Sequence, residues 1–282
     1  MKVLRSVADV RAWRAGASRV GFVPTMGALH AGHMSLVERA VRETEAAIVS
    51  IFVNPTQFGP NEDFAAYPRK EAEDVALLES HGCAAAFLPP VAEIYPPGDA
   101  TRVTPGPIAE RLEGAARPGH FVGVATVVAK LLAIVRPDIA FFGQKDFQQL
   151  RVLQTTARDL RLGVDVVGCP TVREPDGLAM SSRNAYLMPE QRRAAVALSR
   201  GLFAARELWE QGVREPDRLC DAVRRHAGGL GISLEYVSAA DPITLVELEA
   251  PADSAVISLA ARVGKARLID NVLLGMDLAD LR

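Results

Sequence analysis

The chain has 282 residues, of which 49% are hydrophobic and 23% charged, as in an ordinary globular protein with one large or two modest domains. Its formal net charge of −2 excludes a broad basic surface, so no nucleic-acid partner is expected. The three cysteines show no paired spacing and no apolar leader follows a basic start, which favours buried, reduced thiols and a cytoplasmic location.

The first predicted element is a short apolar strand over residues 19–23. Pro24 is expected to end it, because proline cannot continue a central strand, and Gly27 supplies the free backbone for a turn. A helix should begin near His30, since apolar residues recur at helical spacing soon after it. His30 and His33 then share a face of the first helical turn.

This histidine pair predicts a phosphate site. The first turn of a helix presents unpaired N–H groups and a positive dipole end that attracts anions, and Gly32 allows a ligand close to the backbone. Helix capping and zinc binding are the alternatives. A closed zinc site is disfavoured, because the other histidines lie far away in the sequence and the cysteines show no ligand spacing.

Strand-like and helix-like segments then alternate. The longest apolar run, 121–135, contains Lys130 and is shorter than the roughly 20 residues of a membrane span, so we expect a buried helix and no membrane partner. The repetition predicts an α/β fold with a Rossmann-like parallel sheet and helices on both faces. The predicted strands are 47–53, 84–88, 138–142 and 164–167, and the predicted helices are within 67–82 and at 121–135 and 146–162.

The pattern changes after Val172. Residues 177–184 combine small, hydroxyl and cationic side chains without clear periodicity and are expected to form a mobile loop or linker. Two helices and three strands follow, an order that predicts a smaller C-terminal α+β domain. The expected domains are 1–175 and 176–282. The elements predicted in the second are helices at 189–212 and 215–226 and strands at 234–238, 255–260 and 266–274.

Four loops are expected at the carboxyl ends of the parallel strands, where ligands bind in such sheets. They are residues 24–33, 54–59, 143–149 and 172–184, and each carries polar or glycine residues. Because all four loops carry such residues, we expect them to form one ligand-binding site along this edge of the sheet.

Two of these loops carry cations. Lys145 could neutralise phosphate charge. A lysine is slightly unfavourable at the positive start of a helix, and this cost favours a functional reason for its presence. Arg183, with Ser181 and Ser182, could close over phosphates. The alternatives are a solvated lysine at a helix start and a solvated turn.

The neutral amides of Gln57 and Gln149 suit the orientation of a small hydroxy acid or carboxylate. Asn54 is expected to form a turn, and His120 to be structural. Because no serine or cysteine has an adjacent base, a covalent mechanism is not suggested. The donors, cations and amides suit nucleotidyl transfer, in which the protein positions reactants and stabilises phosphate charge.

The segment at 24–33, Pro-Thr-Met-Gly-Ala-Leu-His-Ala-Gly-His, resembles the His-x-Gly-His signature of the nucleotidylyltransferase and class I aminoacyl-tRNA synthetase superfamily. Its form is similar to that of the pantothenate synthetase (pantoate–β-alanine ligase) family. Further segments match that family in the same order over nearly the whole chain: 52–59, 117–121, 142–149, 180–184 and 267–271.

The resemblance implies an ATP-dependent ligase that condenses (R)-pantoate with β-alanine to give pantothenate, AMP and pyrophosphate through pantoyl adenylate. It implies pantoate, β-alanine and ATP as small-molecule partners, Mg²⁺ with ATP, and a homodimer. The sequence does not designate the Mg²⁺ ligands.

The resemblance also implies residue roles. His33 matches a proton donor, His30 helps to hold the phosphates, Lys145 stabilises the transferring phosphate, and Arg183 belongs to a flexible phosphate loop. Gln57 and Gln149 match the pantoate positions, with Gln57 also serving β-alanine, and Gln144 replaces a glutamate common in relatives. The implied ATP-binding residues are Met26, Gly27, Ala28, Leu29, His30, Ala31, Gly32, His33, Gly143, Gln144, Lys145, Asp146, Val172, Met180, Ser181, Ser182 and Arg183.

Two rival functions stay open. One is a nucleotidylyltransferase that acts on a phosphate-bearing substrate, against which the Gln57 and Gln149 pair argues, since a phosphate would need more cations. The other is a nucleotide-binding sensor without catalysis, against which His33, Lys145 and Arg183 argue.

Overall fold

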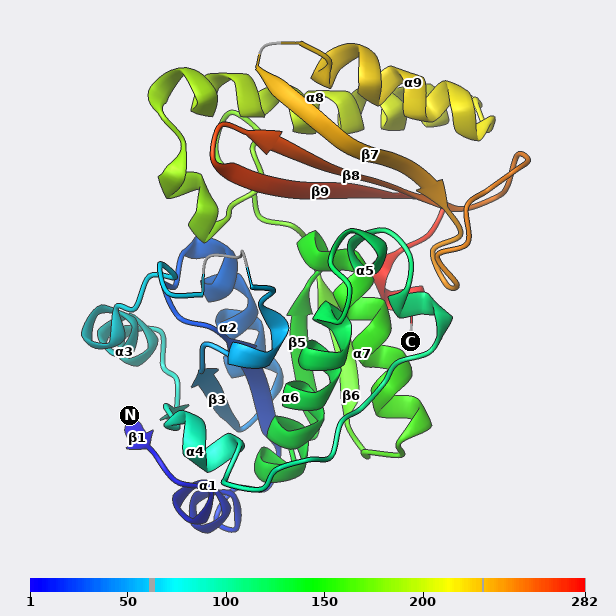
Figure 1. Cartoon of the computed structure of the whole chain (residues 1–282). Helices are drawn as coiled ribbons and strands as arrows, with labels where there is room; N and C mark the ends of the chain where they lie inside the picture. The colour runs from blue at the N-terminus through cyan, green and yellow to red at the C-terminus, as the bar shows by residue number, and fades with distance from the viewer. Residues whose placement is uncertain (61–63, 230, 282) are drawn as a thin grey trace. The chain divides into compact units, whose positions relative to one another are not determined.

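A computed structural model describes residues 1–60, 64–229 and 231–281. The chain divides into two compact units (Figure 1). Unit 1 comprises residues 1–143 and 149–169, and unit 2 comprises residues 144–148 and 170–281.

Unit 1 is built on a parallel sheet of six strands in the order β1-β4-β3-β2-β5-β6. From β2 the chain builds β3 and β4 on one side and later β5 and β6 on the other, so the strand order reverses between β2 and β5. At such a switch point the loops diverge and leave a crevice for ligands. The strands are β1 (Lys2–Leu4), β2 (Val20–Thr25), β3 (Ala46–Ile51), β4 (Ala85–Phe87), β5 (Ile139–Gly143) and β6 (Asp165–Cys169).

Helices cover both faces of this sheet, which confirms the predicted α/β fold. Val23 and Val49 belong to a buried cluster with residues of α2 and α3, whereas their strand neighbours Phe22 and Ile48 point to the opposite face and are equally inaccessible. The helices are α1 (Val7–Arg14), α2 (Ala31–Glu43), α3 (Glu71–Ser80), α4 (Val91–Ile94), α5 (Glu113–Ala116), α6 (His120–Val135) and α7 (Phe147–Asp159), with 3₁₀ turns η1 (Pro55–Gln57) and η2 (Pro107–Ala109). The 3₁₀ turn η3 (Gln144–Asp146), which precedes α7, belongs to unit 2.

The expectation that Pro24 ends its strand was wrong. Pro24 lies inside β2 and pairs with Ser50 of β3. The Val20 carbonyl oxygen accepts from the backbone N–H of Asp138, so the backbone polar groups of Val20 face β5. The backbone groups of every second residue in a strand face the same neighbour, so the nitrogen of Pro24 also faces β5. Pairing of β2 with β5 ends at Phe22, and the missing N–H therefore leaves no ladder bond unmade.

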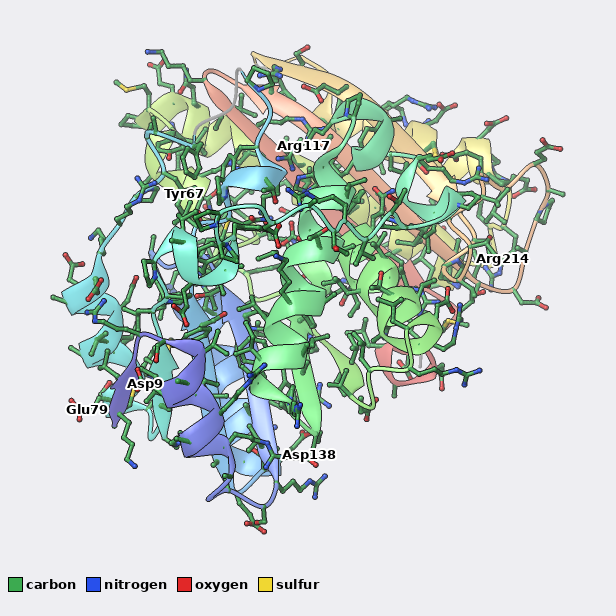
Figure 2. All side chains as sticks on the ribbon, turned by 60° about the horizontal axis from the view of Figure 1, so that its bottom comes forward. Asp9, Tyr67, Glu79, Arg117, Asp138 and Arg214 are labelled. Atoms are coloured by element: carbon green, nitrogen blue, oxygen red, sulfur yellow. The ribbon has the colours of Figure 1, made fainter. Side chains whose placement is uncertain are left out.

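The first two elements, β1 and α1, were not predicted. β1 is three residues long and too short to show a pattern. α1 begins with a capping box in which Ser6 and Asp9 exchange side-chain-to-backbone bonds; Asp9 is labelled in Figure 2. The Ser-x-x-Asp spacing is the sequence signal that would have found this helix.

The predicted helix at 121–135 is confirmed as α6, and most of its residues are buried. No helix in the described part of the chain is long and apolar enough to span a membrane.

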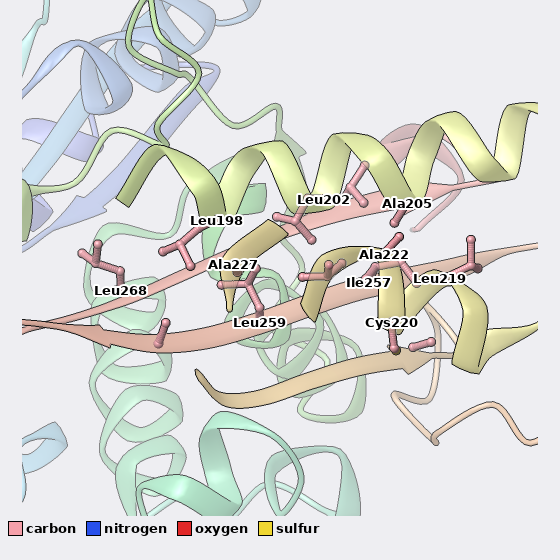
Figure 3. Packing of buried hydrophobic residues seen from close by; sticks show 14 of the residues in the cluster. Leu198, Leu202, Ala205, Leu219, Cys220, Ala222, Ala227, Ile257, Leu259 and Leu268 are labelled. Atoms are coloured by element: carbon pink, nitrogen blue, oxygen red, sulfur yellow. The ribbon is translucent and has the colours of Figure 1, made fainter. Parts of the chain in front are cut away.

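Unit 2 contains an antiparallel sheet in the order β7-β8-β9 with helices α8 and α9, as the predicted small α+β domain requires. Leu198 and Leu202 of α8, Leu219 of α9 and Ile257 of β8 lie in one buried cluster (Figure 3). The elements are η4 (Ser182–Tyr186), α8 (Pro189–Glu210), α9 (Pro216–Ala227), β7 (Ile232–Ala240), β8 (Ala255–Val263), β9 (Ala266–Leu274) and η5 (Leu278–Asp280).

Candidate functional site

The loop after β2 makes a tight turn in the left-handed region. Gly27 has φ +83° and Ala28 has φ +51°. Thr25 Oγ1 donates to Ser50 O at 2.8 Å and accepts from Gly27 N at 3.2 Å, which fixes where the turn starts. A Cβ at Gly27 would lie 3.0 Å from Asp74 Oδ2. Glycine is therefore required at this position both for its φ angle and for space.

The turn delivers His30 and His33 to the start of α2, and both imidazoles cap the helix. His30 Nδ1 accepts from Gly32 N at 3.1 Å, and His33 Nδ1 lies 3.4 Å from His30 N, the longer half of a capping box. The ring centroids are 4.1 Å apart. Helix capping, one of the two alternatives to a phosphate site, is thus confirmed.

This capping decides what the rings can offer. Because each Nδ1 accepts a backbone N–H, the neutral imidazoles carry their protons on Nε2, so each ring is a donor at Nε2. The first turn of α2 has no acidic residue, although carboxylates are favoured there. A positive helix end with two imidazole donors suits phosphate oxygens, and phosphate binding by this pair stays a prediction.

Gln57 lies at the end of η1, and its side-chain amide is oriented by two neutral groups. Asn54, which is 1% exposed, donates from Nδ2 to Gln57 Oε1 at 2.9 Å. Gln57 Nε2 lies 3.3 Å from Met26 Sδ. Within unit 1, the amide of Gln57, predicted to bind the acid substrate, therefore contacts Met26 of the histidine loop, which is residues 26–33.

Asn54 is more than the predicted turn former. It caps η1 by accepting from Thr56 N, and the same Oδ1 accepts from Tyr95 Oη at 2.8 Å. Its Nδ2 also donates to Gly123 O of α6 at 3.2 Å. Three segments of unit 1 thus meet on this one buried amide.

The backbone of Gln57 is held as well. Its carbonyl oxygen lies 2.9 Å from His120 Nδ1 and accepts from Arg117, labelled in Figure 2, at 3.4 Å. A Cβ at Gly123 would lie 2.3 Å from Thr56 O, so α6 approaches η1 as closely as only glycine allows. His120, expected to be structural, supports the backbone of a predicted site residue. The other predicted amide, Gln149, is half-buried in α7.

In unit 2, the predicted residues Gln144, Lys145 and Asp146 form η3. Asn271 of β9, which is buried, donates from Nδ2 to Gln144 O and Lys145 O, both at 2.9 Å. Lys145 Nζ lies 3.7 Å from Asp146 Oδ2. β9 therefore fixes the backbone from which the Lys145 side chain extends.

In the segment expected to be a mobile loop or linker, residues 177–181 have no helix or strand apart from one bridge residue, and residues 182–184 begin the 3₁₀ turn η4. Arg173 and Ala179 form a bridge, and Ser181 caps η4 by accepting from Arg183 N at 3.3 Å. Arg173 also forms a two-bond ion pair with buried Asp270, at 2.6 and 3.0 Å. Side-chain-to-backbone bonds such as the Ser181 cap follow no apolar period, so no pattern in the sequence predicts them.

Three supporting residues were missed. Asp74 of α3 binds the histidine loop, Tyr95 binds Asn54, and Asn271 binds η3. Only Asn271 lay in a segment singled out from the sequence, and none of the three had a pattern that indicated its partner.

No group of three or more His, Cys, Asp or Glu side chains that could hold a metal ion occurs in the described residues. Mg²⁺ commonly keeps its waters and binds nucleotide phosphates with few protein ligands. The imidazoles, amide and lysine described above fit a Mg²⁺ ion that is carried by a nucleotide better than one that is enclosed by protein ligands.

Residues 2–273 match the family described as pantoate-beta-alanine ligase. The chain belongs to the pantoate–β-alanine ligase family. A pantothenate synthetase of Chloroflexus aurantiacus is 55% identical over 276 residues, covering 97% of this chain and 98% of that protein. One of Myxococcus xanthus is 52% identical over 280 residues, covering 97% and 96%.

Solved structures of this family have the same fold. The pantothenate synthetase of Thermus thermophilus superposes with a TM-score of 0.92 at 48% identity, covering 96% of this chain and 99% of that one. A pantoate–β-alanine ligase of Francisella tularensis, complexed with beta-gamma ATP and β-alanine, superposes with a TM-score of 0.78 at 34% identity and covers 99% of both chains.

Proposed function

We propose that this protein condenses (R)-pantoate with β-alanine, using ATP, to give pantothenate, AMP and pyrophosphate through pantoyl adenylate. The observation that carries the proposal is the family match over residues 2–273. The capped histidine pair and the amide of Gln57 supply groups that this chemistry needs.

In the first step, a carboxylate oxygen of pantoate attacks the α-phosphorus of ATP. The new O–P bond forms as the bond to the bridging oxygen of the β-phosphate breaks, and pyrophosphate leaves with the electron pair. His33 is proposed as the proton donor and His30 as a phosphate ligand, both through Nε2, because each Nδ1 accepts within the helix cap. Lys145 is proposed to stabilise charge on the transferring phosphate.

In the second step, the amine nitrogen of β-alanine attacks the acyl carbon of the adenylate. The C–N bond forms, the bond from that carbon to the AMP oxygen breaks, and the nitrogen releases a proton. Gln57 is proposed to orient pantoate and β-alanine, and Gln149 to bind pantoate. The two-sided support of Gln57 by Asn54 and Met26 favours this role, since a fixed amide pre-organises its ligand.

ATP is proposed to bind the segments 26–33 and 143–146, Val172 and the segment 180–183, with Arg183 contacting the phosphates. Mg²⁺, when bound with ATP, would neutralise phosphate charge. Two further proposals come from the family resemblance: a homodimer, and a division of labour in which 1–175 binds ATP and pantoate while 176–282 acts as a lid.

The decisive experiment is an assay with ATP, pantoate and β-alanine together, in which AMP and pantothenate should form in equal amounts. ATP and pantoate without β-alanine should support exchange of labelled pyrophosphate into ATP. Absence of exchange would remove the acyl-adenylate mechanism. Exchange that needs a phosphate-bearing acceptor would favour a nucleotidylyltransferase, and binding without turnover would favour a sensor.

A further inference from the structure

Asp74 is a buried carboxylate that binds the turn in front of the histidine pair. It lies in α3 and is 3% exposed. Its Oδ2 accepts from Ala28 N at 2.9 Å, and its Oδ1 accepts from Leu29 N at 2.8 Å. One side chain thus satisfies two successive backbone N–H groups that come from a loop more than forty residues away in the sequence.

The turn that Asp74 binds has an unfavourable conformation. Ala28 has φ +51°, and a non-glycine residue in the left-handed region costs about 1–2 kcal/mol. Hydrogen bonds to an ionised acceptor are about twice as strong as neutral ones. The two hydrogen bonds that Asp74 accepts therefore offset the cost of the turn and favour this conformation over extended alternatives.

The bound turn separates two groups of the proposed site. Met26, on one side, contacts the amide of Gln57 through its sulfur. His30, on the other side, is the N-cap of α2 and directly follows Leu29. A displacement of the Ala28 and Leu29 amides would move both groups, and an error of about 1 Å in positioning reacting groups can lower rates about a hundredfold.

We propose that Asp74 is a positioning residue for adenylate formation. It holds the 26–30 segment so that the two imidazoles and Met26 keep their places, without itself touching a substrate. This inference rests on the proposed function and adds to it a residue outside the His-x-Gly-His signature.

The test is pyrophosphate–ATP exchange in Asp74→Asn, which keeps the size of the side chain but replaces one acceptor oxygen with a donor that opposes a backbone N–H. We expect kcat/KM for ATP to fall about tenfold or more for the folded protein, while the melting temperature falls by only about a few degrees. Glu73→Gln is the matched control, because Glu73 lies on the same helix with a side chain 70% exposed and pairs with exposed Lys70 at 2.7 Å. It should retain wild-type exchange.

A second variant separates positioning from general stability. Ala28→Gly removes the conformational cost of the turn. In the Asp74→Asn background it should therefore raise the exchange rate at least threefold above that of Asp74→Asn alone. If Asp74→Asn does not fold, Asp74→Glu takes its place, since it keeps the charge but displaces both oxygens by one methylene, and it too should lower exchange.

Wild-type exchange in a folded Asp74 variant would overturn the inference, as would a loss of exchange that only parallels loss of folded protein. No exchange by the wild-type protein would instead overturn the proposed function, and the role of Asp74 with it.

Discussion

Asn54 donates a side-chain hydrogen bond to Gln57 across 2.9 Å, and only 1% of Asn54 is exposed. The bond fixes which end of the Gln57 amide is oxygen and which is nitrogen, because Asn54 Nδ2 can only donate. Asn54 Oδ1 is occupied by Tyr95 Oη and the Thr56 backbone, so the donor itself cannot flip without losing them. A chain of buried bonds therefore sets the amide orientation that the proposed acid site presents.

Replacing Gln57 by Ala should mainly weaken binding of the acid substrates. Removal of one neutral hydrogen-bonding group costs about 0.5–1.5 kcal/mol, and more when a buried partner loses its bond, so we expect the KM for pantoate to rise about tenfold and the melting temperature to change little. Steady-state kinetics with each substrate varied in turn would measure this. Gln211→Ala, at an exposed helix end, is the control. Unchanged saturation by pantoate and β-alanine would count against the assignment.

Replacing Gly123 by Ala should displace η1 and, with it, the side-chain amide of Gln57. The added Cβ would meet Thr56 O at 2.3 Å, which forces α6 and η1 apart. Overpacking of this kind costs about 1–3 kcal/mol, and a higher KM for pantoate should accompany it. Urea unfolding and pantoate kinetics are the measurements, with Gly106→Ala as control, because a Cβ there meets nothing within 4 Å. Equal behaviour of the two variants would contradict the close approach of α6.

Lys145→Ala should lower turnover far more than it weakens pantoate binding, because a group that acts on charge developing in the transition state contributes to kcat. Asn271→Ala should give a milder loss together with reduced thermal stability, since it releases the Gln144 and Lys145 carbonyls of η3. Exchange rates and melting temperatures measured side by side separate the two effects. A Lys145→Ala enzyme with normal turnover and poor pantoate affinity would reject the proposed role.

The thiols should be inert in the native protein. Burial raises the pKa of Cys83 and of Cys220 to about 11, and burial also raises the pKa of Cys169. At pH 8 a disulfide reagent should therefore modify no thiol until the protein is unfolded, when all three react.

The same pKa shifts predict the direction of the pH dependence of stability. In the unfolded chain the thiols ionise at about pH 8.5, whereas the buried thiols stay protonated at that pH. Their contribution to stability is thus complete below about pH 8.5 and is lost as the pH rises towards 11. The urea midpoint should fall across this window. Rapid modification of native thiols at pH 8 would show that they are accessible and disprove the prediction.

The sequence by itself determined the α/β class, the small C-terminal α+β domain and the helix that begins at the histidine pair. These features rest on local patterns: the strand predicted at 266–274 has the bounds of β9, and the one predicted at 47–53 overlaps β3 (Ala46–Ile51). The ordered motifs also gave the family, which the match over residues 2–273 establishes. β1 is too short to show a local pattern. The rule that proline does not continue a central strand failed for Pro24, because pairing between β2 and β5 has already ended at Phe22 and no N–H is needed on that side.

Only the tertiary structure decided how the predicted site residues are supported. Asp74 meets the Ala28 and Leu29 amides, and Tyr95 meets Asn54, through bonds between residues about forty positions apart. Asn271 reaches η3 across more than a hundred residues. Such bonds depend on where folded segments meet rather than on any period or spacing, so the sequence could name the histidines and glutamines but not the buried groups that hold them in place.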